Sequence, residues 1–468
     1  MGRSNLVACA RLGAVVVTVV FAQLATAAEL DPPPLVRLIA AARSDGGALA
    51  RLIELCDDIG HRLSGTPAFD KAVLWAVAAL KADGIASARA EPVTVPRWVR
   101  GDESLAVVTP RPFALSMVGL GGSCATPPAG ITAPVLVVRD LAELKAKAAD
   151  AKGKIIVFNQ PMPTYTEKNR SGYGETVQQR VHGATWAHQH GGVAALVRSV
   201  TAKSLLTPHT GGARFDGQGT PVPTAAIATE HADLLARWQA RGITPTVTLK
   251  MQAHFEAPVV QANVVAEIRG SQLPNEVVVI GGHLDSWDIG QGAHDDGAGV
   301  VMAMQSLVVL HKLGFKPKRT IRAVLFANEE NGLAGGKAYA EAHKAEKHVA
   351  ALEADSGAFA PAGLGVDAKD PKMLEALAAF AETVTAQLKP QFGALKVFKG
   401  DGGADISPLR EAGVPAFGLV VEGSRYFDTH HTPADTVDKV DPKELADCVA
   451  YMAALAWLLS ETGVPVPK

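Results

Sequence analysis

Short apolar runs rich in β-branched residues alternate with longer amphipathic segments over the second half of the chain. The pattern predicts strands at 276–283, 319–328, 348–355 and 416–421, and helices at 296–313, 333–344, 371–387, 406–412 and 442–461. Alternation of this kind is typical of a mixed, mostly parallel sheet with helices on both faces. We therefore expect an α/β fold for this half of the chain.

The first half of the chain has a different pattern. Apolar spacing predicts helices within 35–56 and at 67–82, joined by the polar turn 61–67 (HRLSGTP). We expect this turn to be a loop and His61 to have a structural role. From about 113 to 256 the chain is richer in β-type segments, with strands predicted at 133–138, 154–159, 194–199 and 246–251, and helices at 141–151 and 181–190.

The first 27 residues have the pattern of a secretory signal peptide. Arg3 and Arg11 supply positive charge, an apolar run follows at 12–24, and the small residues 25–27 form a cleavage pattern. The apolar run is short for a membrane span, and no later stretch is long and apolar enough to cross a bilayer. We expect the mature protein to be secreted or periplasmic, with no membrane contact after signal cleavage.

Composition and charge narrow the range of partners. Removing the leader takes away two arginines and no acid, so the formal charge changes from −2 to −4. This balance, without any basic cluster, argues against a nucleic-acid partner. Three cysteines remain, at positions 56, 124 and 448, and their spacing fits neither a metal site nor a disulfide framework. The length of 468 residues predicts two or three domains.

Candidate chemistry begins at 281–299 (GGHLDSWDIGQGAHDDGAG), at the end of the apolar run 277–280. Open α/β sheets place their ligands beyond the carboxyl ends of strands. His283 and Asp285 lie at that end, one residue apart, so an extended backbone directs both side chains to one face. A neutral imidazole binds zinc, and a neighbouring carboxylate can fix its tautomer. Asp295 follows in a glycine-rich loop whose backbone can pass close to an ion.

Three later stretches also place metal-ligand side chains near strand ends. FANEE (326–330) ends one strand with paired carboxylates, EADSG (353–357) ends another, and THHTPADT (429–436) contains two histidines. A surface turn would explain H-x-D alone. The succession of H-x-D, D, EE, D and H after successive strands instead indicates one metal centre.

With these segments, the chain resembles the co-catalytic zinc exopeptidases, the family of bacterial secreted aminopeptidases and glutamate carboxypeptidases. GHLDSWD, GQGAHDDG and HHTPADT are the most specific parts of a likeness that covers most of the chain after the leader. The likeness is closest to the plasma glutamate carboxypeptidases. It implies a zinc peptidase domain at 28–112 and 257–468. Within 113–256, GKIIVFNQP, HGATWAHQHGGVAALV and PVPTAAI resemble an inserted, β-rich protease-associated domain.

The resemblance implies two zinc ions per chain, with one bridging aspartate and two further ligands for each ion. The matching residues are Asp295 for the bridge, His283 and Asp355 for one ion, and Glu330 and His431 for the other. Oxygen and nitrogen donors suit zinc, although the sequence leaves manganese and cobalt open. In this family the peptide bond after the bridging aspartate is commonly cis, which here is the bond between Asp295 and Asp296.

The resemblance also implies catalytic roles beside the metal ligands. Glu329 matches the general base, which takes a proton from water and passes it to the leaving nitrogen. Asp285 matches the carboxylate that orients His283. Either His430 or His431 could be the ligand in the late motif; His431 is favoured because a threonine directly follows it, and we expect His430 to contact the substrate.

Arg425 is a candidate for reading a free substrate carboxylate. It lies six residues before His431, in a loop that must approach the metals for His431 to bind. A guanidinium can hold both carboxylate oxygens at once. A solvated loop arginine is the alternative.

The resulting prediction is a metallo-exopeptidase that hydrolyses dipeptides or short peptides. An aminopeptidase acting on longer peptides is the alternative enzyme. A non-catalytic binding protein is the alternative class, because the transferrin receptor keeps this fold without the site; here all five ligand positions and the base are intact. The intact Asp295 also argues against a glutaminyl cyclase, which keeps one metal. The resemblance implies a small peptide substrate and a homodimer.

Overall fold

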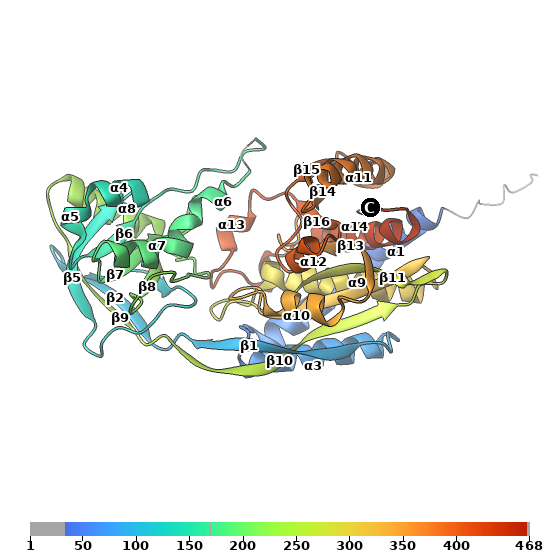
Figure 1. Ribbon diagram of the computed structural model, residues 1–468, viewed down its shortest axis with the longest axis horizontal. Helices are drawn as coiled ribbons and strands as arrows, with labels where there is room; N and C mark the ends of the chain where they lie inside the picture. Colours follow the sequence, from blue (N-terminus) through green and yellow to red (C-terminus); the bar gives the residue numbers. More distant parts are fainter. Residues whose placement is uncertain (1–32, 169, 466–468) are drawn as a thin grey trace, which may run out of the picture. The chain divides into compact units, whose positions relative to one another are not determined.

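The computed structural model describes residues 33–168 and 170–465 (Figure 1). The predicted signal peptide at 1–27 lies outside the described residues. Pro34–Lys468 form one compact unit, and its described part contains two eight-stranded sheets. Within these described ranges, no helix is both long and apolar enough to cross a bilayer.

The first sheet is the mixed sheet predicted for the second half of the chain. Its four central strands are parallel, because β11 pairs in parallel with β12 and β13, and β13 with β16. Antiparallel pairing adds β10 and β1 beside β12, and β14 beside β16. In spatial order the strands are β1 (Arg89–Val99), β10 (His254–Ile268), β12 (Arg319–Phe326), β11 (Leu273–His283), β13 (Lys347–Glu353), β16 (Ala416–Val421), β14 (Pro361–Asp367) and β15 (Lys396–Lys399).

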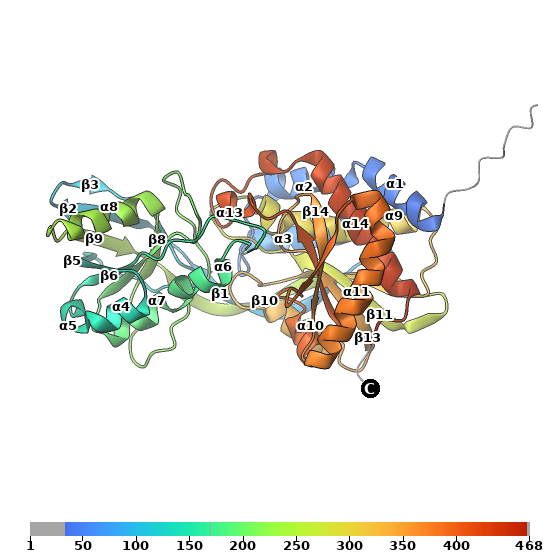
Figure 2. The same ribbon diagram turned by 90° about the horizontal axis from the view of Figure 1, so that it is seen from above.

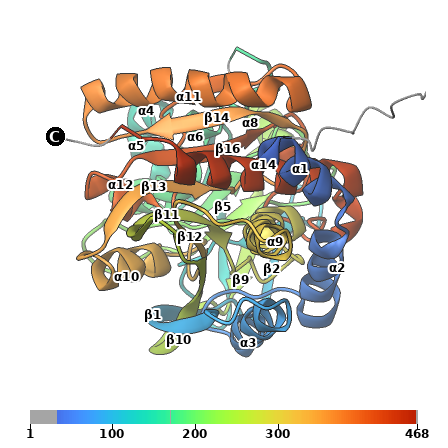
Figure 3. The same cartoon turned by 90° about the vertical axis from the view of Figure 1, so that its right-hand side faces the viewer.

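Helices cover both faces of this sheet. Successive residues of a strand point to opposite faces, and in the central strands both sets of side chains are apolar. Val278 and Ile280 of β11 face the larger core, with α1, α2, α3, α9, α11 and α14, whereas Val277 and Val279 face a smaller core with α10 and α12 (Figure 3). The helices are α1 (Pro34–Ser44), α2 (Gly47–Ile53), α3 (Pro67–Ala82), α9 (Ala298–Lys312), α10 (Ala334–Ala342), α11 (Pro371–Phe392), α12 (Ser407–Glu411), the short α13 (Tyr426–Thr429) and α14 (Pro442–Glu461). The predicted α/β fold is confirmed.

Several predicted boundaries are confirmed to the residue, namely those of α3, β16 and α14. Helices α3 and α14 each begin with a proline that follows a capping side chain. Thr66 accepts the N–H of Phe69, and Asp441 accepts that of Glu444. The helical region 35–56 is divided. The break lies at residues 45–46, and Gly47, the first residue of α2, packs too closely against Asp45 and a glutamine of α9 to carry a side chain.

The second sheet is formed by residues between Glu103 and Met251. Four parallel strands, β5 to β8, lie at its centre, with antiparallel strands on both sides. In spatial order the strands are β3 (Phe113–Ala114), β2 (Glu103–Thr109), β9 (Thr246–Met251), β5 (Ile131–Val138), β6 (Ile155–Phe158), β7 (Ala194–Arg198), β8 (Thr224–Ile227) and β4 (Met117–Gly119). The chain passes between the two sheets along the paired strands β1 and β10 (Figure 2).

This sheet also carries helices, namely α4 (Leu141–Ala146), α5 (Ala148–Ala151), α6 (Tyr173–Thr176), α7 (Gln178–Gln189) and α8 (Thr229–Ala240). Ile155 and Val157 of β6 share a core with α8, whereas Ile156 and Phe158 share another with α7. The region is therefore a mixed α/β layer: helices lie where they were predicted, at 141–151 and 181–190, and α6 and α8 were not predicted. Its assignment as a protease-associated insert at 113–256 stays a prediction.

Candidate active site

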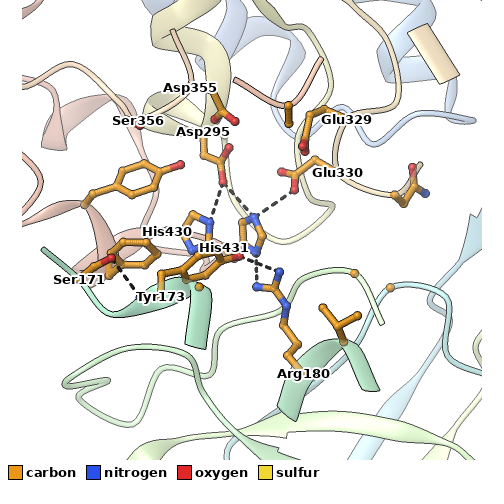
Figure 4. A pocket seen from close by; sticks show the side chains of 18 of the residues that line it. Ser171, Tyr173, Arg180, Asp295, Glu329, Glu330, Asp355, Ser356, His430 and His431 are labelled. Atoms are coloured by element: carbon orange, nitrogen blue, oxygen red, sulfur yellow. Dashed lines mark hydrogen bonds and ion pairs between the residues drawn. The ribbon is translucent and has the colours of Figure 1, made fainter. Parts of the chain in front are cut away.

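The predicted ligands lie beyond the carboxyl ends of the parallel strands in the first sheet. His283 is the last residue of β11, Glu330 follows β12, and Asp355 follows β13. His431 comes shortly after α13, which follows β16. Because parallel strands end at one edge of a sheet, the topology brings these side chains together around Asp295. Figure 4 shows Glu330, Asp355 and His431 beside Asp295.

Asp295 lies at the centre of the cluster. Its Oδ1 is 3.2 Å from His283 Nε2, and its Oδ2 is 3.1 Å from His431 Nε2. On one side, His283 Nε2 is 3.5 Å from Asp355 Oδ1; on the other, His431 Nε2 is 3.0 Å from Glu330 Oε2. The two oxygens of one carboxylate thus face the two halves of the cluster, which is the arrangement that a bridging ligand needs. The Asp295–Asp296 peptide bond is cis, as the resemblance implies.

The donor atoms of this cluster fit a metal ion. Asp295 Oδ2 and Glu330 Oε1 are buried and have no hydrogen-bond partner among the described residues. Two groups have all their potential ligand atoms within 4.8 Å of one another: Asp295, His430 and His431, and His283, Asp296 and Asp355. Imidazole nitrogen and carboxylate oxygen are donors that zinc accepts. His430 and Asp296, which were not predicted as ligands, thus also have potential ligand atoms in these two groups.

Burial and crowding shift the pKa values of the acids in the cluster. Burial raises the pKa of Glu330 to about 7, and the charge of Asp295 adds to the effect. Burial also raises the pKa of Glu329 well above its usual range, with Asp355 and Glu330 contributing. Although burial opposes it, the imidazoles of His283 and His431 beside its carboxylate lower the pKa of Asp295 well below its usual range. Without a cation the cluster therefore retains protons, and a bound cation would displace them.

Asp285 acts differently from the prediction. His283 Nδ1 is 2.9 Å from the backbone oxygen of Asp285 but 3.8 Å from its carboxylate Oδ1. That carboxylate instead accepts the backbone N–H of Glu329, at 3.0 Å, and that of Glu330, at 3.3 Å. The backbone of Asp285 therefore orients His283, and its side chain fixes the segment that carries the paired glutamates.

Two supporting contacts were not predicted. The carboxylate of Asp435 accepts the backbone N–H groups of His294 and Asp295, at 2.9 and 3.1 Å. The backbone oxygen of Thr210, from the second sheet region, lies 3.2 Å from His431 Nδ1 and can accept its proton, which leaves Nε2 free as a ligand. Asp435 is part of the HHTPADT motif, which was a usable signal. Thr210 is far away in sequence, and no motif marks it.

His430 lies inside the site. Its ring stacks on that of His431 with centroids 3.6 Å apart, and its Nε2 is 3.5 Å from Asp295 Oδ2. Burial lowers the pKa of His430 well below its usual range, and the neighbouring His431 adds to the effect. A neutral imidazole is therefore exposed to the cavity beside the cluster. Contact with substrate stays a prediction for this residue.

A cavity of about 1030 Å³ opens from the cluster. Glu329, Glu330 and Asp355 line one side, and Tyr173 and Arg180 from the second sheet region line another (Figure 4). Arg425 is not among the lining residues. Its Nη2 lies 2.7 and 2.9 Å from the two carboxylate oxygens of Glu444, and its guanidinium stacks on Phe359. The predicted substrate contact of Arg425 is therefore not supported, because Glu444 already neutralises it.

Comparison with known proteins agrees with this fold and site. Residues 263–456 match Peptidase family M28. Carboxypeptidase Q of Mus musculus is 40% identical over 420 residues, which are 89% of this chain and 86% of that protein. Carboxypeptidase Q of Homo sapiens is 37% identical over 436 residues, 93% of this chain and 89% of that protein.

Solved structures show the same relationship. A peptidase M28 precursor from Shewanella amazonensis SB2B has a TM-score of 0.87 and 36% identity, covering 93% of this chain and 98% of that chain. BSAP, a zinc aminopeptidase from Bacillus subtilis, shares the fold with a TM-score of 0.64 and 20% identity, over 90% of this chain and 97% of that chain. The chain belongs to peptidase family M28 and is a metallo-exopeptidase. Within that family, it is similar to carboxypeptidase Q over most of its length.

Proposed function

We propose that this chain is a secreted two-zinc dipeptidase or carboxypeptidase that acts on short peptides with a free carboxylate. The observation that carries this proposal is a buried arginine in the cavity wall. Arg180, in α7, is 7% exposed. Its Nη2 donates to the hydroxyl of Tyr173 at 2.8 Å, and its Nη1 lies 3.4 Å from His431 Nδ1.

Among the described residues, Arg180 has no acidic partner. Its Nε is buried without a hydrogen bond, and no described carboxylate forms an ion pair with its guanidinium. Of the four other buried arginines among the described residues, three are paired with a carboxylate, namely Arg51 with Asp83, Arg198 with Asp233 and Arg322 with Glu267. The fourth, Arg62, donates to three backbone carbonyls instead. A buried charge without a counterion is costly. An anionic ligand in the cavity would remove that cost.

The position of Arg180 favours an anion close to the scissile bond. Its guanidinium is one imidazole ring away from the cluster around Asp295. A substrate carboxylate held there would therefore lie near the bond that is cut, as in a dipeptide or at the last bond of a short peptide. An aminopeptidase on long peptides would leave Arg180 without a counterion, so this alternative is less well supported.

The catalytic roles follow from the cluster. Asp295 would bridge two zinc ions, with His283 and Asp355 on one and Glu330 and His431 on the other; bound zinc supplies an acidified water and polarises the carbonyl. Glu329 takes the proton of the attacking water and gives it to the leaving amine. Asp285 holds the backbone of Glu329 and Glu330 in place. His430 faces the substrate beside the ligands.

The proposal extends to location and organisation. The leader pattern at 1–27, together with the similarity to carboxypeptidase Q, supports a secreted or periplasmic protein. The resemblance supports a peptidase domain at 28–112 and 257–468, an inserted protease-associated domain at 113–256, and a homodimer.

The test compares each free dipeptide with its C-terminal amide. We expect Arg180→Ala to lower kcat/KM for free dipeptides by about 10²-fold, because a charge-assisted contact to the carboxylate is lost. The amides should change far less. Arg180→Lys keeps the charge and loses the planar fork, so its kcat/KM for free dipeptides should lie between those of the wild type and of Arg180→Ala. Steady-state kinetics, with products identified by mass, provide the measurement.

Arg425→Ala is the comparison variant for this test. It removes the arginine that was the candidate from the sequence and that is not among the residues lining the cavity, so free and amidated dipeptides should both keep their rates. Metal content is measured in parallel, because Arg180 also touches His431. An equal loss for free and amidated substrates with Arg180→Ala would show that Arg180 does not read the carboxylate, and would favour the aminopeptidase alternative.

A further inference from the structure

The turn that joins the helical region 35–59 to α3 contacts the active-site loops through three consecutive side chains. Arg62 is fully buried. Its Nε donates to the backbone oxygen of Leu284 at 2.6 Å, its Nη1 to that of Gln291 at 2.6 Å, and its Nη2 to that of Gly292 at 2.9 Å. All three carbonyls belong to the loop between His283 and Asp295. One guanidinium therefore fixes both ends of the segment that links two proposed ligands.

Ser64 makes hydrogen bonds to a different active-site segment, the one that carries Glu329 and Glu330. It is also fully buried. Its Oγ donates to Asn331 Oδ1 at 2.9 Å and accepts from Asn328 Nδ2 at 2.8 Å. These two asparagines directly flank Glu329 and Glu330. Ser64 thus holds both sides of the pair that carries the proposed base and a proposed ligand.

Leu63, between these residues, packs into the apolar cluster that contains Trp287 of the first loop. The Trp287 ring lies edge-on to that of His431, with centroids 5.7 Å apart. Asp435 holds the first loop from the other side, because it accepts the N–H groups of His294 and Asp295. The turn and Asp435 together supply both hydrogen-bond donors and acceptors to a loop that has no regular secondary structure from residue 285 to 292.

We propose that residues 62–64 are a positioning element that sets the distance between the His283–Asp295 loop and the Glu329–Glu330 segment. A two-metal site requires ligands from both loops to be held to within a fraction of an ångström, and outer residues provide that accuracy. A guanidinium reaching three carbonyls cannot be replaced by lysine, whose single ammonium lacks the planar fork. The inference rests on the proposed function for the roles of the ligands and the base.

The first test is Ser64→Ala. Losing the hydroxyl removes one contact from each asparagine, while the contact between Asn328 and Asn331 remains. We therefore expect kcat to fall about 10-fold while KM stays within about twofold. Ser64→Thr, which keeps the hydroxyl, should restore most of the rate. His61→Ala is the matched control, because His61 is an exposed residue of the same turn and makes none of these contacts. Unchanged kcat in Ser64→Ala, with normal thermal stability, would overturn the positioning role of Ser64.

The second test is Arg62→Lys, read by zinc affinity without any substrate. Displacing the loop between two ligands should weaken zinc binding about 10-fold or more in a competition titration with a chelator. If this variant does not fold, Arg62→Gln, which keeps two donors without a buried charge, is measured instead. Wild-type zinc affinity in a folded variant would overturn the proposal. Absence of zinc binding in the unmodified protein would instead reject the proposed function, so the two failures are distinguishable.

The double variant tests whether one element serves both loops. If the turn couples them, Ser64→Ala should lower kcat less in the Arg62→Lys background than in the wild type, since the spacing is already lost. Multiplicative effects would mean that the two contacts act independently, and would contradict a shared positioning role.

Discussion

Replacing Glu329 by glutamine should lower kcat by about 10²–10⁴-fold while the bound metal stays unchanged. Glu329 lines the cavity beside Glu330, and its backbone N–H is held by Asp285. The isosteric amide keeps the shape of the site and cannot take a proton. KM should therefore change little, since substrate contacts remain in place. The measurement combines steady-state kinetics on a free dipeptide with metal analysis of the purified variant.

The matched control is Glu341→Gln. Glu341 is an exposed glutamate of α10 whose carboxylate pairs only with Lys344 on the same surface, so its loss should leave kcat unchanged. Loss of metal together with activity in Glu329→Gln would contradict the assignment. In that case Glu329 would be a ligand, and Glu330 would be the candidate for the base.

The sequence predicted the half of the site that depends on local pattern. His283, Glu330 and Asp355 each end or follow an apolar strand, and the topology of a parallel sheet requires such positions to converge. The boundaries of α3 and α14 were equally accessible, because a capping residue and a proline mark the start of each helix. These features need only a few neighbouring residues to be read.

The remaining half depends on contacts between distant segments. Arg180 approaches His431 across 251 positions of sequence, and nothing in the segment around it marks a binding residue. Arg425 was a candidate because it is close to His431 in sequence, with a solvated loop arginine as the alternative, and its side chain turns to Glu444 of α14. Proximity along the chain therefore did not indicate which arginine lines the cavity. The cavity position of Arg180 depends on how the second sheet region packs beside the first.

Asp285 shows a further limit of motif matching. The H-x-D spacing indicates that two side chains share a face, and the resemblance assigned the carboxylate to His283. In the structure the carboxylate turns to the backbone of Glu329 and Glu330, because those N–H groups follow the end of β12 and have no partner in the sheet. The structure places Asp285 beside the predicted ligands, but its carboxylate contacts other groups than the predicted one.

Removing the metal with a strong chelator should abolish hydrolysis, and zinc should restore it. Removal of the metal should also make the stability of the folded protein more sensitive to rising pH. In the metal-free state, burial raises the pKa of Glu330 from 4.5 to about 7. Between these values the folded chain holds a proton that the unfolded chain has lost, so stability falls as pH rises through this window. The contribution of this group is on the order of 3 kcal/mol.

Zinc should reverse this trend, because it replaces the proton on the carboxylate and binds more tightly as pH increases. We expect the Tm of the metal-free protein to fall by a few degrees between about pH 5 and pH 7.5. Saturating zinc should remove the part of that fall that comes from its ligands. Burial also raises the pKa values of Asp435 and Glu353 to about 7, and neither residue is a proposed ligand, so part of the decline should persist with zinc. Full activity after exhaustive chelation, with no metal detected, would reject the metal-dependent mechanism. A metal-free Tm that rises over the same pH range would show that buried histidines with lowered pKa values, such as His294 and His348, outweigh the buried acids.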